Sequence, residues 1–553
     1  MKEEVLVSQA SMRNWERLSV NKKEFKTRMT KRANKRFSSK TIIPVEYFIE
    51  PSNLEILNNI LSTKKDIKTV ILSLGINYLK ANHISNKFTE KILIEYGKNV
   101  TPDKYLLNIN LPKNEIDFLG IVYQSLMTEG SKNQKGSYYT PTNLTKDITD
   151  KIKEDVKILD PCCGTGSFLL SVAKKIKNPQ NIYGYDLDEN ACFIAKINLI
   201  VEFKNIEFMP QIFHKDFLLK DNLRQDFDVI ATNPPWGAVT SPEYKKLYPL
   251  IASKESFSYF ILKSEKFLHK NGIAYFVLPE SILNVKVHKD IRQFILKNYQ
   301  IVEIKNIGRA FSGVLSKVVV LTLSKQKSNE NISIKINEKE YKINPKYYLK
   351  NTNNIFSIID NFDVNLLKKI YSHPHQTLDN SSIWAIGIVT GNNKKYISAN
   401  KNLGEKIYSG KNILKNKISD SENYINYTRE NFQQVAPENI YRAKEKLVYK
   451  FISKKLIFAY DNKQRLFLNS ANILIPKLEN YTIKDVMTFL NSTLFQYIYT
   501  KKFNELKVLK GNLMELPFPV FDKKKYKELS DNTIFRIFNL TDDEIKYIKN
   551  EVK

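Results

Sequence analysis

Apolar and polar positions alternate in two different ways along the middle of the chain. Between about Thr142 and Ser324, apolar runs of strand length are separated by segments in which apolar residues recur at helical spacing. The predicted strands are Val156–Leu159, Ile182–Tyr185, Phe227–Thr232, Gly272–Leu278, Ile301–Ile307 and Lys317–Leu323, with Ile206–Ile212 a poorer candidate interrupted by Pro210. The predicted helices are Asn143–Lys153, Ser167–Lys177, Glu189–Phe203, Phe257–Leu268 and Glu280–Lys297. This order predicts an α/β domain with an open, mostly parallel sheet covered by helices on both faces.

The regions on either side of this domain have different patterns. Residues 1–120 are basic and mainly helical in pattern, and residues 7–40 within them resemble a small helix-turn-helix, although a solvated charged arm fits equally well. After Ser324, a Lys- and Asn-rich stretch predicts a linker with a small hairpin. Residues 350–553 then lack regular alternation and predict a separate α+β domain. We therefore expect three regions, with the α/β domain at 121–330.

The charge balance points to a polyanionic partner. The 553 residues include 87 Lys or Arg and 58 Asp or Glu, so 87 − 58 gives a formal charge of +29. Segment 391–470 alone holds 16 basic and 7 acidic residues, interleaved with Tyr and Phe. The length exceeds what one compact core accommodates, and a hydrophobic share of 42% excludes a wholly disordered chain.

Cysteine, histidine and apolar runs exclude several other classes of protein. Three Cys do not make a disulfide scaffold, and six scattered His without paired-ligand spacing predict no metal site. No apolar run approaches the ~18–20 residues of a membrane helix, and the first residues carry no secretion signal. We expect a cytoplasmic protein without a membrane partner.

The first predicted strand runs into a glycine-containing turn. Val156–Leu159 is followed by Asp160, the turn closes with Gly164 and Gly166, and a helix begins at Ser167. Glycines in such a turn let the backbone approach a ligand that faces the helix N-terminus. The three-glycine dinucleotide pattern is absent, and Asp160 would repel phosphate but could hold a cationic amino group.

Acidic residues also follow the next strands. Asp186 comes after the second strand, where an acid can accept both hydroxyl groups of a ribose. Asp216 follows the third and could accept from the amino group of an adenine, while Phe217 or Leu187 packs on its ring. Sites for an amino acid, a ribose and an adenine, in this order, indicate S-adenosyl-L-methionine as the cofactor.

The fourth predicted strand, Phe227–Thr232, leads into Asn233, Pro234, Pro235 and Trp236. Two prolines stiffen the turn, so the Asn233 side-chain oxygen and the Pro234 carbonyl can both accept hydrogen bonds from one amino group. Trp236 offers an aromatic face on which a base can stack. This turn is the predicted catalytic site for a planar amine.

On these residues, the part of the chain from about 119 to 324 resembles the gamma-class adenine DNA methyltransferases of restriction–modification systems. The matching motifs are GSYYTP at 136–141, ILDPCCGTGSFL at 158–169, GYDLDENA at 184–191, HKDFL at 214–218 and ATNPPWG at 231–237. The resemblance implies a Rossmann-like catalytic domain in which Tyr139, Thr140 and Pro141 lie over the methionine part of the cofactor. It also makes Phe311 the candidate for a second aromatic residue against the base. Trp236 stands where the family usually has Tyr or Phe.

The C-terminal half is similar to the target-recognition domain of Taq-type methylases. The matching segments are GIVTGNNKKYI at 387–397, KFISKKLIFAYD at 450–461, LNSANILIP at 468–476 and LKVLKGNLMELPFP at 506–519. With the catalytic match, the resemblance covers roughly two-thirds of the chain. It implies that residues 350–553 read bases in double-stranded DNA while the catalytic sheet holds an extruded adenine.

The resemblance implies direct transfer of a methyl group to the exocyclic amine of a flipped-out adenine. We find no convincing nuclease motif, because Pro102-Asp103 lacks a suitable acid–Lys pair downstream. Whether a cognate restriction endonuclease exists stays open. Two alternatives also remain: a methyltransferase acting on RNA or on a protein glutamine amide, and a non-catalytic DNA-binding protein descended from a methylase.

Overall fold

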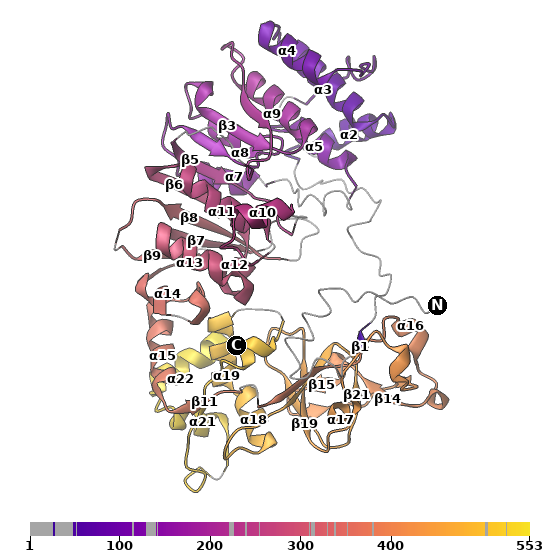
Figure 1. The fold of residues 1–553 in the computed structure, drawn as a ribbon, viewed down its shortest axis with the longest axis vertical. Coiled ribbons are helices and arrows are strands. Elements are labelled where there is room, and N and C mark those ends of the chain that lie inside the picture. Colours follow the sequence, from indigo (N-terminus) through magenta and orange to yellow (C-terminus); the bar gives the residue numbers. More distant parts are fainter. Residues whose placement is uncertain are drawn as a thin grey trace. The chain divides into compact units, whose positions relative to one another are not determined.

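The fold is seen in a computed structural model of the chain (Figure 1). The structure describes residues 26–27, 48–50, 52–112, 115–128, 140, 142–219, 226–237, 241–253, 255–308, 310, 316–328, 330–336, 339–350, 352–378, 381–503, 507–526 and 528–552. The chain divides into two compact units. We call them the α/β unit, Ala33–Asp360, and the C-terminal unit, Asn361–Lys553 together with Met1–Arg32.

A nine-stranded sheet forms the centre of the α/β unit, with the strand order β10-β9-β7-β8-β6-β5-β2-β3-β4 (Figure 1). Its strands are β2 (Ile158–Asp160), β3 (Ile182–Asp186), β4 (Gln211–His214), β5 (Phe227–Thr232), β6 (Leu268–Pro279), β7 (Gln300–Gly308), β8 (Val318–Ser324), β9 (Ile332–Ile336) and β10 (Lys339–Ile343). Strands β4, β3, β2, β5 and β6 run parallel, whereas β8 lies antiparallel between β6 and β7. The predicted open and mostly parallel sheet is confirmed.

The strand pairing decides which loops meet. In the parallel register, Asp160 of β2 lies opposite Gly184 of β3, and Asp186 of β3 lies opposite His214 of β4. Because these strands point the same way, the segments that follow them emerge at one edge of the sheet. The same edge receives the turn after β5, which brings together the segments that follow β2, β3, β4 and β5.

Several elements differ from the sequence-based expectation in their bounds, and one predicted element, the hairpin, has an additional partner. β4 begins only at Gln211, after Pro210, because proline has no N–H to donate to a strand partner. The single helix predicted over Glu280–Lys297 is divided into α12 (Ser281–Asn284), a 3-10 turn and α13 (Lys289–Asn298), since Val285 is extended. The predicted hairpin after Ser324 exists as β9 and β10, and β9 adds to the sheet in parallel with β7.

Two groups of helices pack around this sheet. The helices are α2 (Asn53–Ser62), α3 (Ile67–Ala81), α4 (Lys87–Tyr96), α5 (Phe118–Leu126), α7 (Thr142–Thr149), α8 (Ser167–Ala173), α9 (Glu189–Glu202), α10 (Pro242–Leu247), α11 (Ser256–Phe267), α12, α13 and α14 (Lys346–Lys350). Helices α3, α4 and α5 contact α9, which contacts α8 and β3, and one hydrophobic core joins them to β2 and β5 (Figure 1). Helices α11 and α13 contact each other, and they contact β6 and β7 respectively.

The C-terminal unit combines small sheets with helices, as expected for an α+β domain. One sheet has the order β12 (Ile383–Ile386), β22 (Ala471–Ile475), β19 (Lys446–Lys450), β20 (Phe458–Asp461), and another β13 (Ile397–Ser398), β17 (Tyr424–Ile425), β14 (Glu405–Tyr408), β21 (Leu466–Phe467). Two-residue strands pair as β1 (Lys26–Thr27) with β18 (Gln434–Val435), β11 (His375–Gln376) with β23 (Phe518–Pro519), and β15 (Ile413–Leu414) with β16 (Lys417–Ile418). The helices are α15 (Asn361–Ser372), α16 (Asn393–Tyr396), α17 (Glu438–Tyr441), α18 (Ile483–Leu490), α19 (Thr493–Phe503), α20 (Lys510–Leu513), α21 (Asp531–Ile537) and α22 (Asp542–Val552). Apart from Lys26–Thr27, the predicted helix-turn-helix at 7–40 lies outside the described residues.

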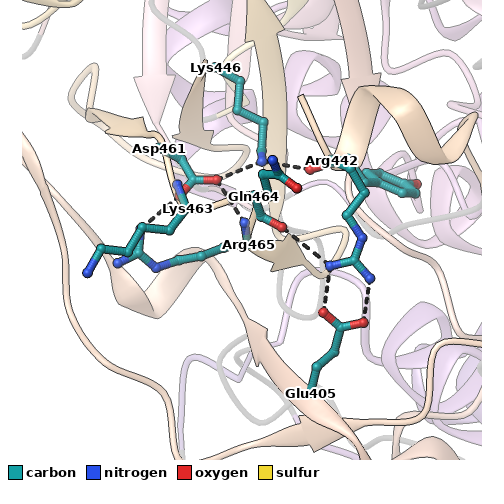
Figure 2. Close-up of polar contacts among 8 residues, drawn as sticks. Glu405, Arg442, Lys446, Asp461, Lys463, Gln464 and Arg465 are labelled. Atoms are coloured by element: carbon teal, nitrogen blue, oxygen red, sulfur yellow. Dashed lines mark hydrogen bonds and ion pairs between the residues drawn. The ribbon is translucent and has the colours of Figure 1, made fainter. Parts of the chain in front are cut away.

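A buried ion cluster holds one turn of the C-terminal unit (Figure 2). The fully buried Asp461 accepts from Lys446 Nζ at 2.6 Å, from Arg465 Nη1 at 2.7 Å, and from the backbone N–H groups of Lys463 and Arg465 at 3.2 and 3.0 Å. Burial alone would raise the pKa of Asp461, but the charge of Lys446 holds it below its ordinary value. The carboxylate therefore stays ionised and fixes the chain between β20 and β21.

Candidate active site

Asp160, the last residue of β2, is a buried acid at the carboxyl edge of the sheet. Its Oδ1 accepts a hydrogen bond from the backbone N–H of Cys162 at 3.1 Å and from the Thr232 hydroxyl at 2.7 Å. Burial, with a smaller effect of the nearby Asp186, raises the pKa of Asp160 to about 7, against the lowering effect of these two hydrogen bonds. Within the described part of the chain, no Lys or Arg forms an ion pair with Asp160. Such a carboxylate is suited to a cationic group on a ligand.

The glycine turn after β2 has the conformation that its glycines permit. Gly164 and Gly166 have φ angles of +53° and +89°, a region that side chains other than glycine rarely adopt. A Cβ at Gly164 would meet no atom within 4 Å, so space is open beside it. The Gly164 N–H donates to Asp186 Oδ2 at 2.9 Å, which ties the turn to the end of β3.

The acids after β3 and β4 are held by their own loops. Asp186 also accepts from the backbone N–H of Asp188 at 2.9 Å, through Oδ1. Asp216 accepts from the Tyr244 hydroxyl at 2.5 Å and from the backbone N–H of Leu218 at 2.8 Å. Both carboxylates are partly exposed, so they are fixed in direction yet reachable from solvent.

The two residues considered for packing on an adenine ring differ in position. The Leu187 side chain is 64% exposed. Phe217 is fully buried, stacks on Phe260 of α11 with ring centroids 6.0 Å apart, and has Lys263 Nζ 4.8 Å from its ring centre. Of the two, only Leu187 presents an apolar surface to solvent, and Phe217 supports the loop from beneath.

The Asn233 side chain faces the segment that precedes α7. Its Nδ2 donates to the Thr140 hydroxyl at 3.2 Å, and the buried Thr140 carbonyl accepts from the Ser167 hydroxyl at 3.5 Å. Because the Asn233 amide nitrogen points to Thr140, the side-chain oxygen of Asn233 points away from Thr140. Thr140, Ser167 and Asn233 therefore join the predicted catalytic turn to the first turn of α8.

The rest of the predicted catalytic turn is tied to β6 and to the start of α11. The Trp236 indole N–H donates to the Val277 carbonyl of β6 at 3.3 Å, and the ring is half-buried against the core. The Ser256 hydroxyl donates to the Pro235 carbonyl, and the Gly237 N–H donates to Glu255 at 3.0 Å. These anchors hold the Asn-Pro-Pro-Trp turn in one arrangement.

Known proteins share this architecture. Residues 114–383 match the N-6 DNA Methylase family, and residues 405–518 match the TaqI-like C-terminal specificity domain. The Type II methyltransferase M.VspI of Vibrio sp. (strain 343) is 35% identical over 301 residues, which span 51% of this chain and 72% of that protein. The chain belongs to the N-6 DNA methylase family. The predicted resemblance to restriction–modification methyltransferases with a C-terminal recognition domain is thus confirmed.

More distant relatives of this N-6 DNA methylase are also similar. The EcoEI methylase subunit, of a Type I restriction enzyme from Escherichia coli, is 28% identical over 214 residues, or 34% of this chain and 43% of that subunit. The solved structure of the Type IIL restriction-modification enzyme MmeI in complex with DNA has a TM-score of 0.58 at 13% identity, over 87% of this chain and 84% of that one. The latter similarity shows a common fold that includes both units.

Several residues of this N-6 DNA methylase site were not predicted from the sequence. Thr232 and Tyr244 contact the acids Asp160 and Asp216, and Asp188 contacts Asp186. Asp188 has a local signal, since an Asp directly before a helical pattern is a favoured N-cap. Tyr244 has none, because its contact depends on how α10 folds back. Three predicted residues, Tyr139, Pro141 and Phe311, lie outside the described residues.

Neither a cluster of metal-binding side chains nor a membrane-spanning helix is found in the described part of the chain. It contains no group of three or more His, Cys, Asp or Glu side chains that could hold a metal ion. None of its helices combines the length and the apolar character needed to cross a membrane.

Proposed function

We propose that this N-6 DNA methylase transfers a methyl group from S-adenosyl-L-methionine to the exocyclic amine of an adenine flipped out of double-stranded DNA. The observation that carries the proposal is the meeting of two features at one sheet edge. A buried acid that pairs with none of the described Lys or Arg residues lies beside an open glycine turn, and a rigid Asn-Pro-Pro-Trp turn follows the adjacent strand. The first suits the methyl donor and the second suits a planar amine.

The residues at the glycine turn fit this donor. Asp160 would hold the amino group, the open space at Gly164 would admit the chain of the methionine, and Asp186 would accept from the ribose hydroxyls. Asp216 and the exposed Leu187 would bind the adenine ring of the donor, while Tyr139, Thr140 and Pro141 would cover its methionine part. When bound, S-adenosyl-L-methionine would supply an electrophilic methyl group: its sulfur–methyl bond would break as the nitrogen–methyl bond forms, S-adenosyl-L-homocysteine would leave, and the amine would release one proton.

The catalytic turn would act on the substrate amine. An adenine amino nitrogen is a weak nucleophile because its lone pair is delocalised into the ring. Hydrogen bonds from its two hydrogens to Asn233 Oδ1 and the Pro234 carbonyl favour the pyramidal, more nucleophilic form, an effect realised mainly in the transition state. Trp236 would stack on one face of the base, and Phe311 would lie against the other.

The acceptor is proposed to be DNA because of the C-terminal unit. The match of this unit to the TaqI-like specificity domain supports binding to a duplex, and so does the formal charge of +29 on the whole chain. Flipping the adenine costs a few kcal/mol, which phosphate contacts would offset, so affinity should fall steeply with salt. We further propose that the chain is a modification enzyme without its own nuclease. The relative M.VspI, which is named as a methyltransferase, supports this proposal.

Incubation with labelled methyl donor tests this function. We expect label in plasmid DNA as N6-methyladenine, and none in total RNA or in a protein mixture. Label confined to RNA, or to glutamine in protein, would replace the proposal with one of those acceptors. Intact plasmid after incubation with Mg²⁺ would support the absence of nuclease activity, whereas cleavage would contradict it.

Donor affinity is predicted to depend on pH through Asp160. With its pKa at about 7, the free protein carries a protonated Asp160 at acidic pH, and this proton must leave before a cationic amino group can bind. The affinity should therefore fall as pH falls, by about eightfold between pH 7.5 and 6. Calorimetry over this range checks it, with Asp160→Asn expected to bind weakly and without pH dependence. Equal affinity at both pH values would refute the role of Asp160.

Replacing Trp236 should weaken the capture of the flipped base. Loss of the aromatic face in Trp236→Ala removes a contact worth about 1–3 kcal/mol, while Trp236→Phe keeps a ring there. A duplex with 2-aminopurine at the target adenine reports extrusion by its fluorescence. We expect the change on binding to be reduced with Trp236→Ala and retained with Trp236→Phe. The same change with both variants would count against stacking.

A further inference from the structure

Helix α5 begins at a buried acid that touches the glycine turn. Asp117, 1% exposed, accepts from the Thr165 hydroxyl at 2.5 Å and from Asn198 Nδ2 at 2.8 Å, and it caps α5 by accepting from the Gly120 N–H at 3.0 Å. Asn198, on α9, also donates to the Thr165 carbonyl at 3.1 Å. Thr165 lies between the two glycines of the turn, so both its side chain and its backbone are held from beneath.

Gly120 is required by this arrangement. A Cβ at Gly120 would lie 2.2 to 2.6 Å from the Asp117 carboxyl group, which is closer than such contacts allow. Only glycine therefore lets the carboxyl group fold over the first turn of α5 and still reach Thr165. Burial raises the pKa of Asp117 to about 7, against the lowering effect of the bonds from Thr165 and Asn198.

The same helix touches the second cofactor loop one turn further on. The hydroxyl of the buried Tyr123 donates to Asp188 Oδ2 at 2.6 Å. Asp188 caps α9 through Oδ1, and its backbone N–H donates to Asp186, whose other oxygen accepts from Gly164. Burial raises the pKa of Tyr123, which keeps its hydroxyl protonated as a donor.

We propose that Asp117 and Tyr123 are positioning residues for the methyl donor, since from one helix they hold both loops that would bind it. Asp117 fixes the glycine turn through Thr165, and Tyr123 fixes Asp186 through Asp188. Neither residue reaches the site itself, because both are buried behind these loops. This inference rests on the proposed function, and it predicts an effect on donor binding rather than on the chemical step.

Single-atom substitutions in the full-length chain test the role of α5. Tyr123→Phe removes only the hydroxyl that Asp188 accepts, and Asp117→Asn alters the bond to Thr165 with little change of volume. Tyr348→Phe is the matched control, because the fully buried Tyr348 of α14 donates its hydroxyl to the Ser357 carbonyl at 2.8 Å, and neither residue belongs to the two loops. The measurements are the Kd of the donor by calorimetry, the KM of the donor and kcat on a substrate duplex, and the melting temperature.

Tyr123→Phe and Asp117→Asn are each expected to raise the Kd and the KM of the donor by about tenfold, the loss expected for one hydrogen bond to a charged or buried polar group. At saturating donor, kcat should stay within about twofold of the wild type, and Tyr348→Phe should leave the donor Kd unchanged.

Three outcomes would overturn the positioning role of α5. The first is an unchanged donor Kd in both α5 variants. The second is an equal rise of the Kd in Tyr348→Phe, which would mean general loosening of the fold. The third is a fall in kcat without a change in Kd. If the wild type binds the donor while Tyr123→Phe and Asp117→Asn bind it equally well, only this inference fails. If the wild type does not bind the donor at all, the proposed function fails with it.

Discussion

Asn233→Ala is expected to abolish methyl transfer, lowering kcat by at least about 10²–10³-fold, the effect of removing one preorganised hydrogen-bonding group at a reacting centre. The Asn233 side chain is held by Thr140, so its carbonyl oxygen needs no reorganisation to accept from a substrate amine. In Asn233→Ala this acceptor is missing in the transition state, when positive charge develops on the amino nitrogen of the substrate. DNA binding should persist, because the proposed phosphate contacts do not involve the Asn233 side chain.

Turnover and DNA affinity must be measured on the same preparations of Asn233→Ala. Single-turnover transfer of labelled methyl gives the rate, and gel retardation at fixed salt gives the affinity. Asn271→Ala, at an exposed position of β6, is the matched control and should behave as the wild type. A variant that loses DNA binding together with turnover, or one that keeps more than about a tenth of the rate, would contradict the assigned role.

Asp461→Ala is expected to destabilise the C-terminal unit by about 3–5 kcal/mol, because it leaves a buried charge without its partner. Lys446 is fully buried and its ammonium group donates to Asp461 and to the Tyr441 carbonyl. Without the carboxylate, Lys446 and the backbone N–H groups of Lys463 and Arg465 lose their acceptor (Figure 2). The free energy of unfolding from urea titration measures the effect.

Two further variants separate burial from charge. Asp420→Ala removes an exposed ion pair with Lys406 and should leave the free energy of unfolding unchanged. Adding Lys446→Met to Asp461→Ala removes the stranded ammonium group and should recover part of the loss. An equal free energy of unfolding for Asp461→Ala and Asp420→Ala would show that burial does not determine the cost of breaking the Asp461–Lys446 ion pair.

The local parts of the site could be predicted because local patterns determine them. The apolar run of β2, the φ angles needed at Gly164 and Gly166, and the start of α8 all follow from neighbouring residues. The meeting of Asp160, Asp186 and Asn233 then follows from parallel strands, whose carboxyl ends share an edge.

The contacts between distant segments could not be predicted in the same way. Asp117 and Thr165 are 48 residues apart, and Tyr123 and Asp188 are 65 residues apart, so their pairing depends on how α5 packs on α9. Phe217 is a similar case, since its burial against Phe260 depends on the position of α11. Single-residue patterns carry no information on such tertiary packing.

The central claim is that an extruded adenine is methylated at its amino nitrogen on the Asn233 turn. Long-read sequencing of modified bases in DNA from cells that express the chain tests it most directly, with cells expressing Asn233→Ala in parallel. We predict N6-methyladenine at one fixed position of one short sequence with the wild type, and none with the variant. Methylated cytosine, or an unmodified genome despite folded and expressed protein, would contradict the account.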